Sequence, residues 1–384
     1  MKKYKLIITL FVFLMYNNVF AQLPFGDSAW VPQSQSDEFN GTVIDWTKWN
    51  TNYWGSAQIA NGAEINYDSN VVVDSGYLSI FADTLAPNVT KAWGNFPDYG
   101  YGTSGQPLTY AYQSGVIQNK YLFFKYGYYE ISAKFPSKNY SLWPAFWLYS
   151  NDCTPGADYA GELDIAENGA ITTYKGNELT GWYHISEITC NYDSSACLHG
   201  GGSITVLPSG DSLSGDFHKF ACQWDPDKFI YYFDDIPIIK MYDTSGHNIP
   251  QHNMTLIIAL GIDPYKAYLP ANWNNPIFVN SPDRFIPNPN PRNWPQKLEL
   301  AYFHYYKLET DCGTNATLCS SGDYDRKVKK SITTNSGCTP TFNPTTPAGS
   351  YTLRATDYIL INEGITISPS GSGSFTIETI DCPQ

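Results

Sequence analysis

The sequence predicts an all-β protein, a β-jelly-roll sandwich followed by a small C-terminal β module. Short runs of β-branched and aromatic residues recur between Gly, Asn, Asp and Pro residues, and helical periodicity is scarce. Many short strands separated by such turn residues are typical of a sandwich or jelly roll. The 61 aromatic residues (11 Trp, 30 Tyr and 20 Phe) supply large side chains for its core.

Residues 1–21 have the features of a secretory signal peptide. A basic start, Met1–Lys5, precedes an apolar core, Leu6–Met15, and Ala21 occupies the small-residue cleavage position. An apolar core of this length is too short to span a bilayer, which takes roughly 20 residues. We therefore expect cleavage after Ala21 and a protein that is secreted, or attached to the cell surface after export.

The main domain is predicted to extend over residues 22–308, because all 11 tryptophans lie between Trp30 and Trp294. Its expected strands include Asn70–Val73, Tyr77–Ile80, Tyr126–Lys134, Phe229–Phe233, Leu256–Ala259 and Ala301–Leu308.

The composition after Leu308 turns to Thr, Ser, Gly and Pro. Residues 309–335 are therefore expected to form a linker and residues 336–384 a small accessory β module, with strands at Tyr351–Leu353 and Tyr358–Ile361. A core this small is expected to need a disulfide for stability.

The charge balance excludes two classes of protein. The chain carries 36 acidic and 23 basic residues, a formal charge of −13. A nucleic-acid binder needs a basic patch to replace the counterions of the phosphates, and no such patch occurs. No apolar run after the first two dozen residues is long enough to span a membrane. We expect a monomer that binds neither nucleic acid nor a bilayer core.

Export permits disulfides among the eight cysteines. Spacing favours three candidate pairs: Cys190 with Cys197, Cys312 with Cys319, and Cys338 with Cys382. Cys153 and Cys222 remain, and a buried free thiol is the alternative for Cys222. No Cys-x-x-Cys pair occurs, so we predict neither a zinc site nor a cofactor.

One segment, Gly161–Asn168, gathers three carboxylates: Glu162, Asp164 and Glu167. Side chains alternate faces along a strand, so the first two share a face and the third points into the core. A β-bulge around Ile165–Ala166 returns Glu167 to the face of the others and avoids burying an unpaired carboxylate. A helix fits less well, because positions five apart lie on different helical faces.

Carboxylates clustered on one face favour glycosidic-bond cleavage, in which one attacks the anomeric carbon and another protonates the leaving oxygen. We expect Glu162 to be the nucleophile, Glu167 the acid and base, and Asp164 the residue that orients Glu162. Like charges nearby raise the pKa of one carboxyl, so Glu167 is expected to hold a proton. The alternative from spacing alone is a solvated acidic strand or a calcium patch.

The motifs over about residues 35–308 resemble glycoside hydrolase family 16. They occur in order, at Asp37–Gly41, Tyr126–Glu130, Leu142–Trp147, Glu162–Glu167, Asp216–His218 and Trp224–Asp227. The carboxylate motif has the bulged form of laminarinases and algal galactanases. The resemblance implies a jelly roll with a concave substrate cleft, cleavage with retention of configuration, and the three roles given above.

Four further residues resemble substrate-binding positions of that family: Trp143 and Trp147, expected to stack on sugar rings, with His184 and Asn61. The alternatives are two core tryptophans and a structural histidine. Ala301 stands where many members carry an Asp that binds structural calcium, so no metal is predicted. The C-terminal module resembles small β modules of secreted Bacteroidetes proteins.

These features together predict a secreted, retaining endo-β-glycan hydrolase, an endo-β-1,3-glucanase of the laminarinase type acting on neutral β-glucans. Only four arginines occur and none precedes Arg284, whereas guanidinium groups are the best ligands for sulfate esters. The alternatives are an agarose-type galactan hydrolase, a transglycosylase and a non-catalytic carbohydrate-binding protein.

Overall fold

The computed structural model describes residues 30–53, 64–92, 107–120, 124–136, 142–150, 160–167, 178–186, 197–206, 213–242, 249–251, 253–262, 294–318, 328–334, 351–361, 375–380 and 382. Apart from one short 3-10 helix, η1 (Asp68–Asn70), every regular element in these ranges is a strand, which confirms the all-β prediction. None of the described residues forms a helix long and apolar enough to cross a membrane. The expected signal peptide lies outside the described residues.

The strands of the main domain are β1 (Trp30–Pro32), β2 (Trp49–Asn50), β3 (Glu64–Asn66), β4 (Val71–Asp74), β5 (Tyr77–Ala92), β6 (Pro107–Ser114), β7 (Val116–Asn119), β8 (Gly127–Lys134), β9 (Leu142–Tyr149), β10 (Ala160–Glu167), β11 (Glu178–Ser186), β12 (Cys197–Val206), β13 (His218–Asp225), β14 (Lys228–Phe233), β15 (Ile236–Tyr242), β16 (Thr255–Ile262) and β17 (Gln296–Leu308).

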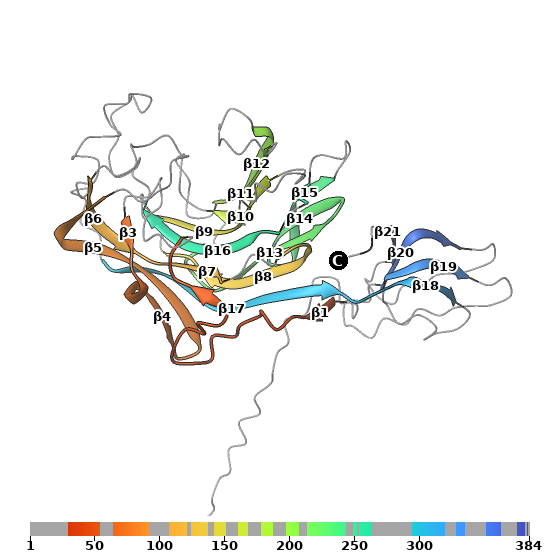
Figure 1. The fold of residues 1–384 in the computed structure, drawn as a ribbon, viewed down its shortest axis with the longest axis horizontal. Coiled ribbons are helices and arrows are strands. Elements are labelled where there is room, and N and C mark those ends of the chain that lie inside the picture. Colours follow the sequence, from red (N-terminus) through yellow and green to blue (C-terminus); the bar gives the residue numbers. More distant parts are fainter. Residues whose placement is uncertain are drawn as a thin grey trace, which may run out of the picture.

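Two large sheets pack face to face (Figure 1). The ten-stranded sheet has the order β15-β14-β13-β8-β17-β5-β6-β3, with β1 beside β17 and β4 beside β5. The seven-stranded sheet has the order β12-β11-β10-β9-β16-β7-β2. All pairings within the seven-stranded sheet are antiparallel, which gives the sandwich that the sequence predicted.

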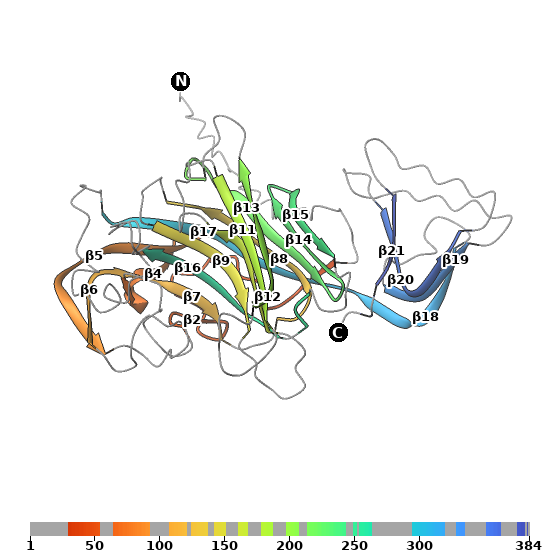
Figure 2. The ribbon, with the colours of Figure 1, turned by 90° about the horizontal axis from the view of Figure 1, so that it is seen from above.

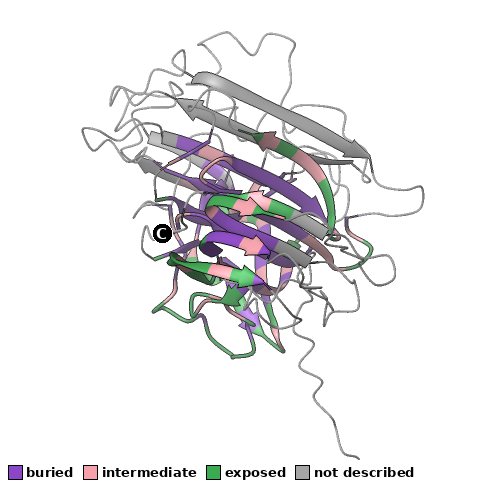
Figure 3. Cartoon of the chain, turned by 90° about the vertical axis from the view of Figure 1, so that its right-hand side faces the viewer, coloured by how far each residue is buried: buried purple, intermediate pink, exposed green. Residues whose placement is uncertain are grey.

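The core lies between these sheets and is formed by alternate residues of the facing strands (Figure 3). Tyr129 and Ile131 of β8 face Phe146 and Leu148 of β9 in one apolar cluster. The ring of Tyr129 also stacks on that of Tyr305, with centroids 4.8 Å apart. Burial of these large side chains is the main favourable contribution to folding.

Two tight hairpins set the strand register in the ten-stranded sheet. Ser75 and Gly76 join β4 to β5 with φ of 54° and 84°, and Asp234 and Asp235 join β14 to β15 with φ of 45° and 68°. Positive φ at both central residues is the signature of a type I′ turn, whose twist matches that of the strands it joins.

The expected linker over 309–335 is wrong, because this segment contains two strands. β18 (Thr310–Leu318), β19 (Val328–Thr334), β20 (Tyr351–Leu360) and β21 (Phe375–Thr379) form a parallel sheet in sequence order. Leu318 and Ile332 pack with Leu353 in the module's own core. Polar composition concealed these strands, since only one side of each contributes to this small core.

The C-terminal module lies beyond the end of β17, beside the main domain (Figures 1 and 2). An apolar cluster joins the two parts and includes Trp30 and Tyr128 of the main domain with Val328 and Ile380 of the module. The contact is therefore formed by buried side chains, in addition to the covalent connection through Glu309.

The structure corrects the expected disulfides of the module. Cys312 pairs with Cys382 across 70 residues, with their Cα atoms 6.0 Å apart, rather than with Cys319. Cys382 therefore does not pair with Cys338. Packing decides this pairing, because the chain returns after β21 to the start of β18.

The other cysteines are described less fully. Cys222 is buried and free, as the alternative interpretation expected. Cys153, Cys190, Cys319 and Cys338 lie outside the described residues, and of Cys197 only the backbone is described.

Candidate active site

Strand β10 carries all three carboxylates on one face of the seven-stranded sheet. Its neighbour β9 pairs Glu162 with Tyr149, Asp164 with Trp147, and Glu167 with Ala145. These three partners lie at alternate positions of β9 and belong to one cluster on the side opposite the core. Since residues opposite each other project to the same face, the three carboxylates share it.

A β-bulge produces this arrangement, as the sequence predicted. The register of β10 shifts between Asp164 and Glu167 against β11, and between Asp164 and Ala166 against β9. Both Ile165 and Ala166 point into the core and are almost completely buried. The extra inward residue turns the side chain of Glu167 back to the face of the other two carboxylates.

Gly181 of β11 lies opposite the bulge, between the partners of Asp164 and Glu167. A Cβ atom at this position would lie 2.9 Å from both Tyr231 and Ile239, side chains of the ten-stranded sheet. Those side chains can pack beneath the bulge because residue 181 is a glycine and has no Cβ atom. Sequence reasoning did not identify this support, because it joins three segments that are distant along the chain.

The carboxylates are shielded from water to different degrees. Asp164 is buried, whereas Glu162 and Glu167 are partly exposed. Burial, together with the charges of Glu162 and Glu167, raises the pKa of Asp164 well above its usual range. Loss of solvent also raises the pKa of Glu167 to about 7, and the charge of Glu162 acts in the same direction. Glu167 can therefore hold a proton near neutral pH.

Trp143 is hydrogen-bonded to one of these carboxylates. Its indole Nε1 donates to Oε1 of Glu167 over 2.8 Å, and this bond opposes the rise in the pKa of Glu167. Trp147 projects from the same face of β9 but is 8% exposed, and its ring packs against Tyr149 with centroids 5.8 Å apart. Sequence reasoning placed both tryptophans on this face but did not predict the bond to Glu167.

His184 lies on β11, the strand that pairs with the carboxylate strand β10. This residue lies opposite Glu162, whereas the partner of Glu167 is Thr180. The side chain of His184 is not described, and Asn61 lies outside the described residues.

The strands of the seven-stranded sheet contain no lysine and no arginine within their described bounds. Among the described residues, no group of three or more His, Cys, Asp or Glu side chains is suited to a metal ion. Ala301, in β17, has no side-chain oxygen to offer at the position expected for a calcium ligand.

Residues 30–275 match the family model of the GH16 domain of β-porphyranases A–D. The chain belongs to glycoside hydrolase family 16. The family expected from the carboxylate motif is thereby confirmed, and so is the jelly-roll fold.

Two curated relatives are similar to part of the chain. Glucan endo-1,3-β-glucosidase A1 of Niallia circulans is 30% identical over 236 residues, which cover 56% of this chain and 30% of that protein. Endo-1,3-1,4-β-glycanase EglC of Rhizobium meliloti is 27% identical over 292 residues, covering 65% of this chain and 54% of that protein. The chain therefore spans about half or less of the length of these relatives.

A solved structure of a laminarinase has the same fold. The laminarinase catalytic domain from Thermotoga maritima superposes with a TM-score of 0.52 at 25% identity, covering 72% of this chain and 98% of that one. Nearly the whole of that catalytic domain thus has a counterpart in this chain.

Replacement of Trp143 by Phe is expected to move the alkaline limb of the pH–rate profile upward and to lower kcat about tenfold. Without the indole N–H, the ionised form of Glu167 loses a hydrogen bond, so its pKa rises further and it stays protonated to higher pH. The profile should be recorded as kcat and kcat/KM on one soluble oligosaccharide.

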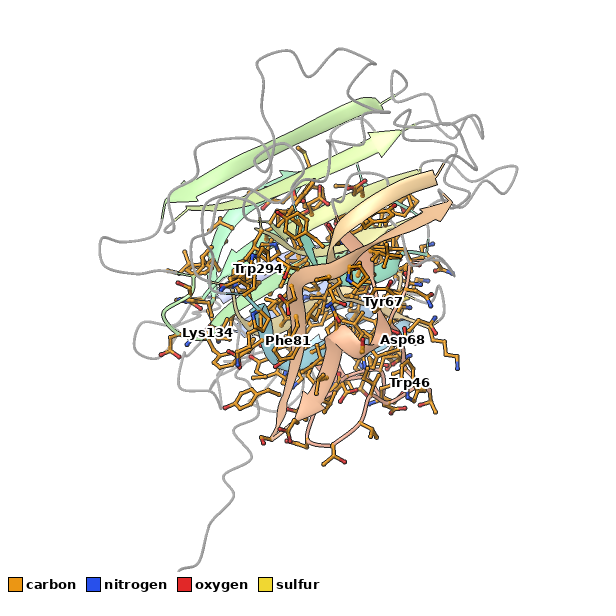
Figure 4. All side chains as sticks on the ribbon, turned by 90° about the vertical axis from the view of Figure 1, so that its left-hand side faces the viewer. Trp46, Tyr67, Asp68, Phe81, Lys134 and Trp294 are labelled. Atoms are coloured by element: carbon orange, nitrogen blue, oxygen red, sulfur yellow. A yellow bond between two sulfur atoms is a disulfide. The ribbon has the colours of Figure 1, made fainter. Side chains whose placement is uncertain are left out.

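Trp46→Phe is the matched control for Trp143→Phe, since Trp46 is 49% exposed near the edge of the domain (Figure 4). It should leave the profile unchanged. An alkaline limb in Trp143→Phe that stays in place, or moves downward, would contradict the assigned bond.

Proposed function

We propose that this protein is a retaining endo-β-glycan hydrolase with Glu162 as nucleophile, Glu167 as acid and base, and Asp164 as positioning residue. The observation that carries the proposal is the bulge in β10, which brings the three carboxylates to one face. A carboxylate pair on one face can act on both sides of a scissile bond. Both glutamates of the carboxylate motif are present in this sequence, which argues against a carbohydrate-binding protein that does not cleave its ligand.

Each residue has a distinct role in the two steps. Protonated Glu167 donates its proton to the leaving glycosidic oxygen while the carboxylate of Glu162 attacks the anomeric carbon and forms a glycosyl ester. Esterification removes the charge of Glu162, and this lowers the pKa of Glu167. Glu167 then accepts a proton from the attacking water, and hydrolysis of the ester releases the sugar with retained configuration.

The lack of cationic side chains on the strands around the carboxylates favours a neutral substrate. We rank β-1,3-glucan first and mixed-linkage glucan second. The strands of the seven-stranded sheet offer no lysine or arginine to a sulfate ester. The one arginine among the described residues, Arg354, belongs to the C-terminal module and donates to Glu378.

The second candidate substrate is an algal galactan, which the match to the β-porphyranase family model favours. Agarose lacks sulfate, so the lack of cationic side chains disfavours it no more than a glucan. A sulfated galactan such as porphyran would need cations from outside the described strands.

Initial rates on laminarin, mixed-linkage glucan, agarose and porphyran test this ranking, and we expect laminarin to be cleaved fastest. Faster cleavage of porphyran would contradict the preference for a neutral chain. Proton NMR of the anomeric signals in the first minutes tests the two-step mechanism. A first product of inverted configuration would contradict Glu162 as nucleophile, and transfer to sugar would appear as longer products.

We also propose that the protein acts outside the cell. The leader-like residues 1–21 and the pairing of Cys312 with Cys382 support export into an oxidising compartment. Whether the exported chain then attaches to the cell surface is tested by fractionating the producing cells.

A further inference from the structure

The last residues of β16 are held by side chains of the opposite sheet. Glu64 of β3, in the ten-stranded sheet, is buried, and its Oε2 accepts from the backbone N–H of Ile262 over 2.8 Å. Ser114 of the neighbouring strand β6 donates through its hydroxyl to the carbonyl of Leu260. Two polar side chains thus connect β16 of one sheet to β3 and β6 of the other.

This end of β16 needs such a partner because the neighbouring strand stops short. The pairing of β7 with β16 covers Ile257–Ala259, whereas β16 continues to Ile262. A buried backbone N–H requires an acceptor, and Ile262 is almost completely buried. The carboxylate of Glu64 supplies that acceptor where the next strand would otherwise do so. Hydrogen bonds to a carboxylate are among the stronger ones in proteins.

Trp143 lies directly beside the end of β16 that Glu64 holds. It pairs with Gly261, and among the described residues the pairing of β9 with β10 ends at Ala145. A Cβ atom on Gly261 would lie 3.5 Å from Cβ of Trp143 and 3.7 Å from Oε1 of Glu64. The carboxylate and the base of the indole side chain therefore lie on either side of the place where Gly261 has no side chain. The position of Trp143 depends on this part of β16.

Glu64 lies at the border of the face that carries the carboxylates. Burial, and in the same direction the charge of Glu64, raise the pKa of Tyr53 well above its usual range. Tyr53 belongs to the apolar cluster of that face, and Trp143 packs against this cluster. With only 1% of its surface exposed, Glu64 does not itself meet a sugar. Its effect on the chemistry must pass through its neighbours.

We propose that Glu64 is a positioning residue that fixes the end of β16 and thereby orients the indole of Trp143 toward Glu167. The proposal rests on the proposed function, in which Glu167 is the acid and base. The bond from the indole Nε1 to Glu167 is 2.8 Å long. Hydrogen bonds weaken steeply when the donor is turned away, so a small displacement of Trp143 is sufficient to weaken this one.

The direction of the expected change follows from the groups around Glu167. Among the described residues, the other titratable groups near it are Glu162 and Asp164 on its own strand and Tyr231 of β14. Removal of the acceptor at Glu64 weakens the indole bond, which favours the ionised form of Glu167, so the pKa of Glu167 rises. A direct effect of the lost negative charge of Glu64 would lower that pKa instead.

Glu64→Met tests the proposal, because it removes the acceptor and keeps a side chain of similar length. We measure the pKa of Glu167 in the free protein by carboxyl ¹³C NMR, with Glu167→Gln to assign the signal. We also record the pH dependence of kcat/KM on one soluble oligosaccharide. We expect the pKa and the alkaline limb to move up by about half a pH unit and kcat to fall about threefold, since the bond is weakened and not removed.

Two further variants separate positioning from a merely structural role. Glu64→Gln keeps an amide oxygen as acceptor and should restore the wild-type pKa of Glu167. Glu64→Met combined with Trp143→Phe should give the same alkaline limb as Trp143→Phe alone, because both changes act through one bond.

Asn119→Leu is the matched control for Glu64→Met. Oδ1 of Asn119 likewise accepts from a backbone N–H of β16, that of Leu256, but at the other end of the strand. This variant should lower the unfolding midpoint, as Glu64→Met does, and leave the pKa of Glu167 unchanged. If Glu64→Met does not fold, Glu64→Asp, which withdraws the carboxylate by one methylene, must give the upward shift.

Three results would overturn the assignment. The first is a pKa of Glu167 that stays in place or falls in Glu64→Met, or in Glu64→Asp where that variant replaces it. The second is a shift in Glu64→Gln as large as that in Glu64→Met. The third is a further shift when Glu64→Met is added to Trp143→Phe.

The proposed function fails in a different way, which appears in the wild-type protein. Wild type would then cleave none of the four polysaccharides given above, while the NMR signal of Glu167 would still report on the bond from Trp143. If wild type cleaves agarose and not laminarin, the pH profiles are recorded on an agaro-oligosaccharide, with the same expected and contradicting outcomes.

Discussion

Glu162→Gln and Glu167→Gln are each expected to lower kcat/KM by roughly a thousandfold on a polysaccharide substrate. An amide in place of the Glu162 carboxylate cannot form the glycosyl ester, and an amide in place of Glu167 can neither donate nor accept the proton, a contribution of roughly 10²–10⁴. Steady-state release of reducing ends measures the loss. Because both side chains are partly exposed on the face opposite the core, the unfolding midpoint should not fall.

Asp164→Asn is the graded comparison for these two variants. Asp164 lies between the two glutamates and, in the proposed mechanism, acts through Glu162, so its replacement should cost less than either glutamate variant. More than a tenth of wild-type turnover in Glu162→Gln would show that the nucleophile is assigned wrongly. We expect Glu162→Gln to be folded and to bind the polysaccharide fully, with almost no turnover. Thermal unfolding checks the fold, and retention on an insoluble polysaccharide checks binding.

Lys228→Met is expected to give the largest loss of stability, roughly 3–5 kcal/mol or on the order of 10 °C in the unfolding midpoint. The ammonium of Lys228 lies 3.6 Å from Asp225 and 3.8 Å from Glu378 of the C-terminal module. Arg354 of the module binds the same Glu378 over 2.9 Å. Without Lys228, the buried carboxylate of Asp225 loses its ion-pair partner where the two parts of the chain meet.

Lys297→Met is the matched control, because its ion pair with Glu299 lies on the surface and the Lys297 side chain is 46% exposed. Surface pairs of this kind contribute about 0–1 kcal/mol, so its midpoint should barely change. The kcat/KM of Lys228→Met, measured well below its midpoint, should equal that of wild type. A midpoint as high as that of the control would show that the module is not held through Lys228.

Local patterns in the sequence were sufficient to predict the bulge and the common face of the three carboxylates. The alternation of residues in β10 required Glu167 to face the core unless one residue was inserted, and the structure has that bulge. The same alternation placed Trp143 and Trp147 on one face of β9. Such predictions succeed because strand geometry repeats every two residues, so a few neighbouring residues determine which face each side chain occupies.

The strands of the module show where local reasoning fails. The segment 309–335 has a polar composition, yet Leu318 and Ile332 bury their side chains against Leu353, which lies much further along the chain. A strand with few apolar residues can still contribute to a core when a neighbouring strand covers those residues. The composition of a segment does not reveal such a neighbour.

The sequence by itself determined the all-β class, the three carboxylates and the bulge that aligns them. Only the tertiary structure decided that Cys312 pairs with Cys382 and that Trp143 donates to Glu167. Each of these contacts joins residues that are distant along the chain. Their distances depend on how whole strands pair and pack, and packing is a property of the complete fold.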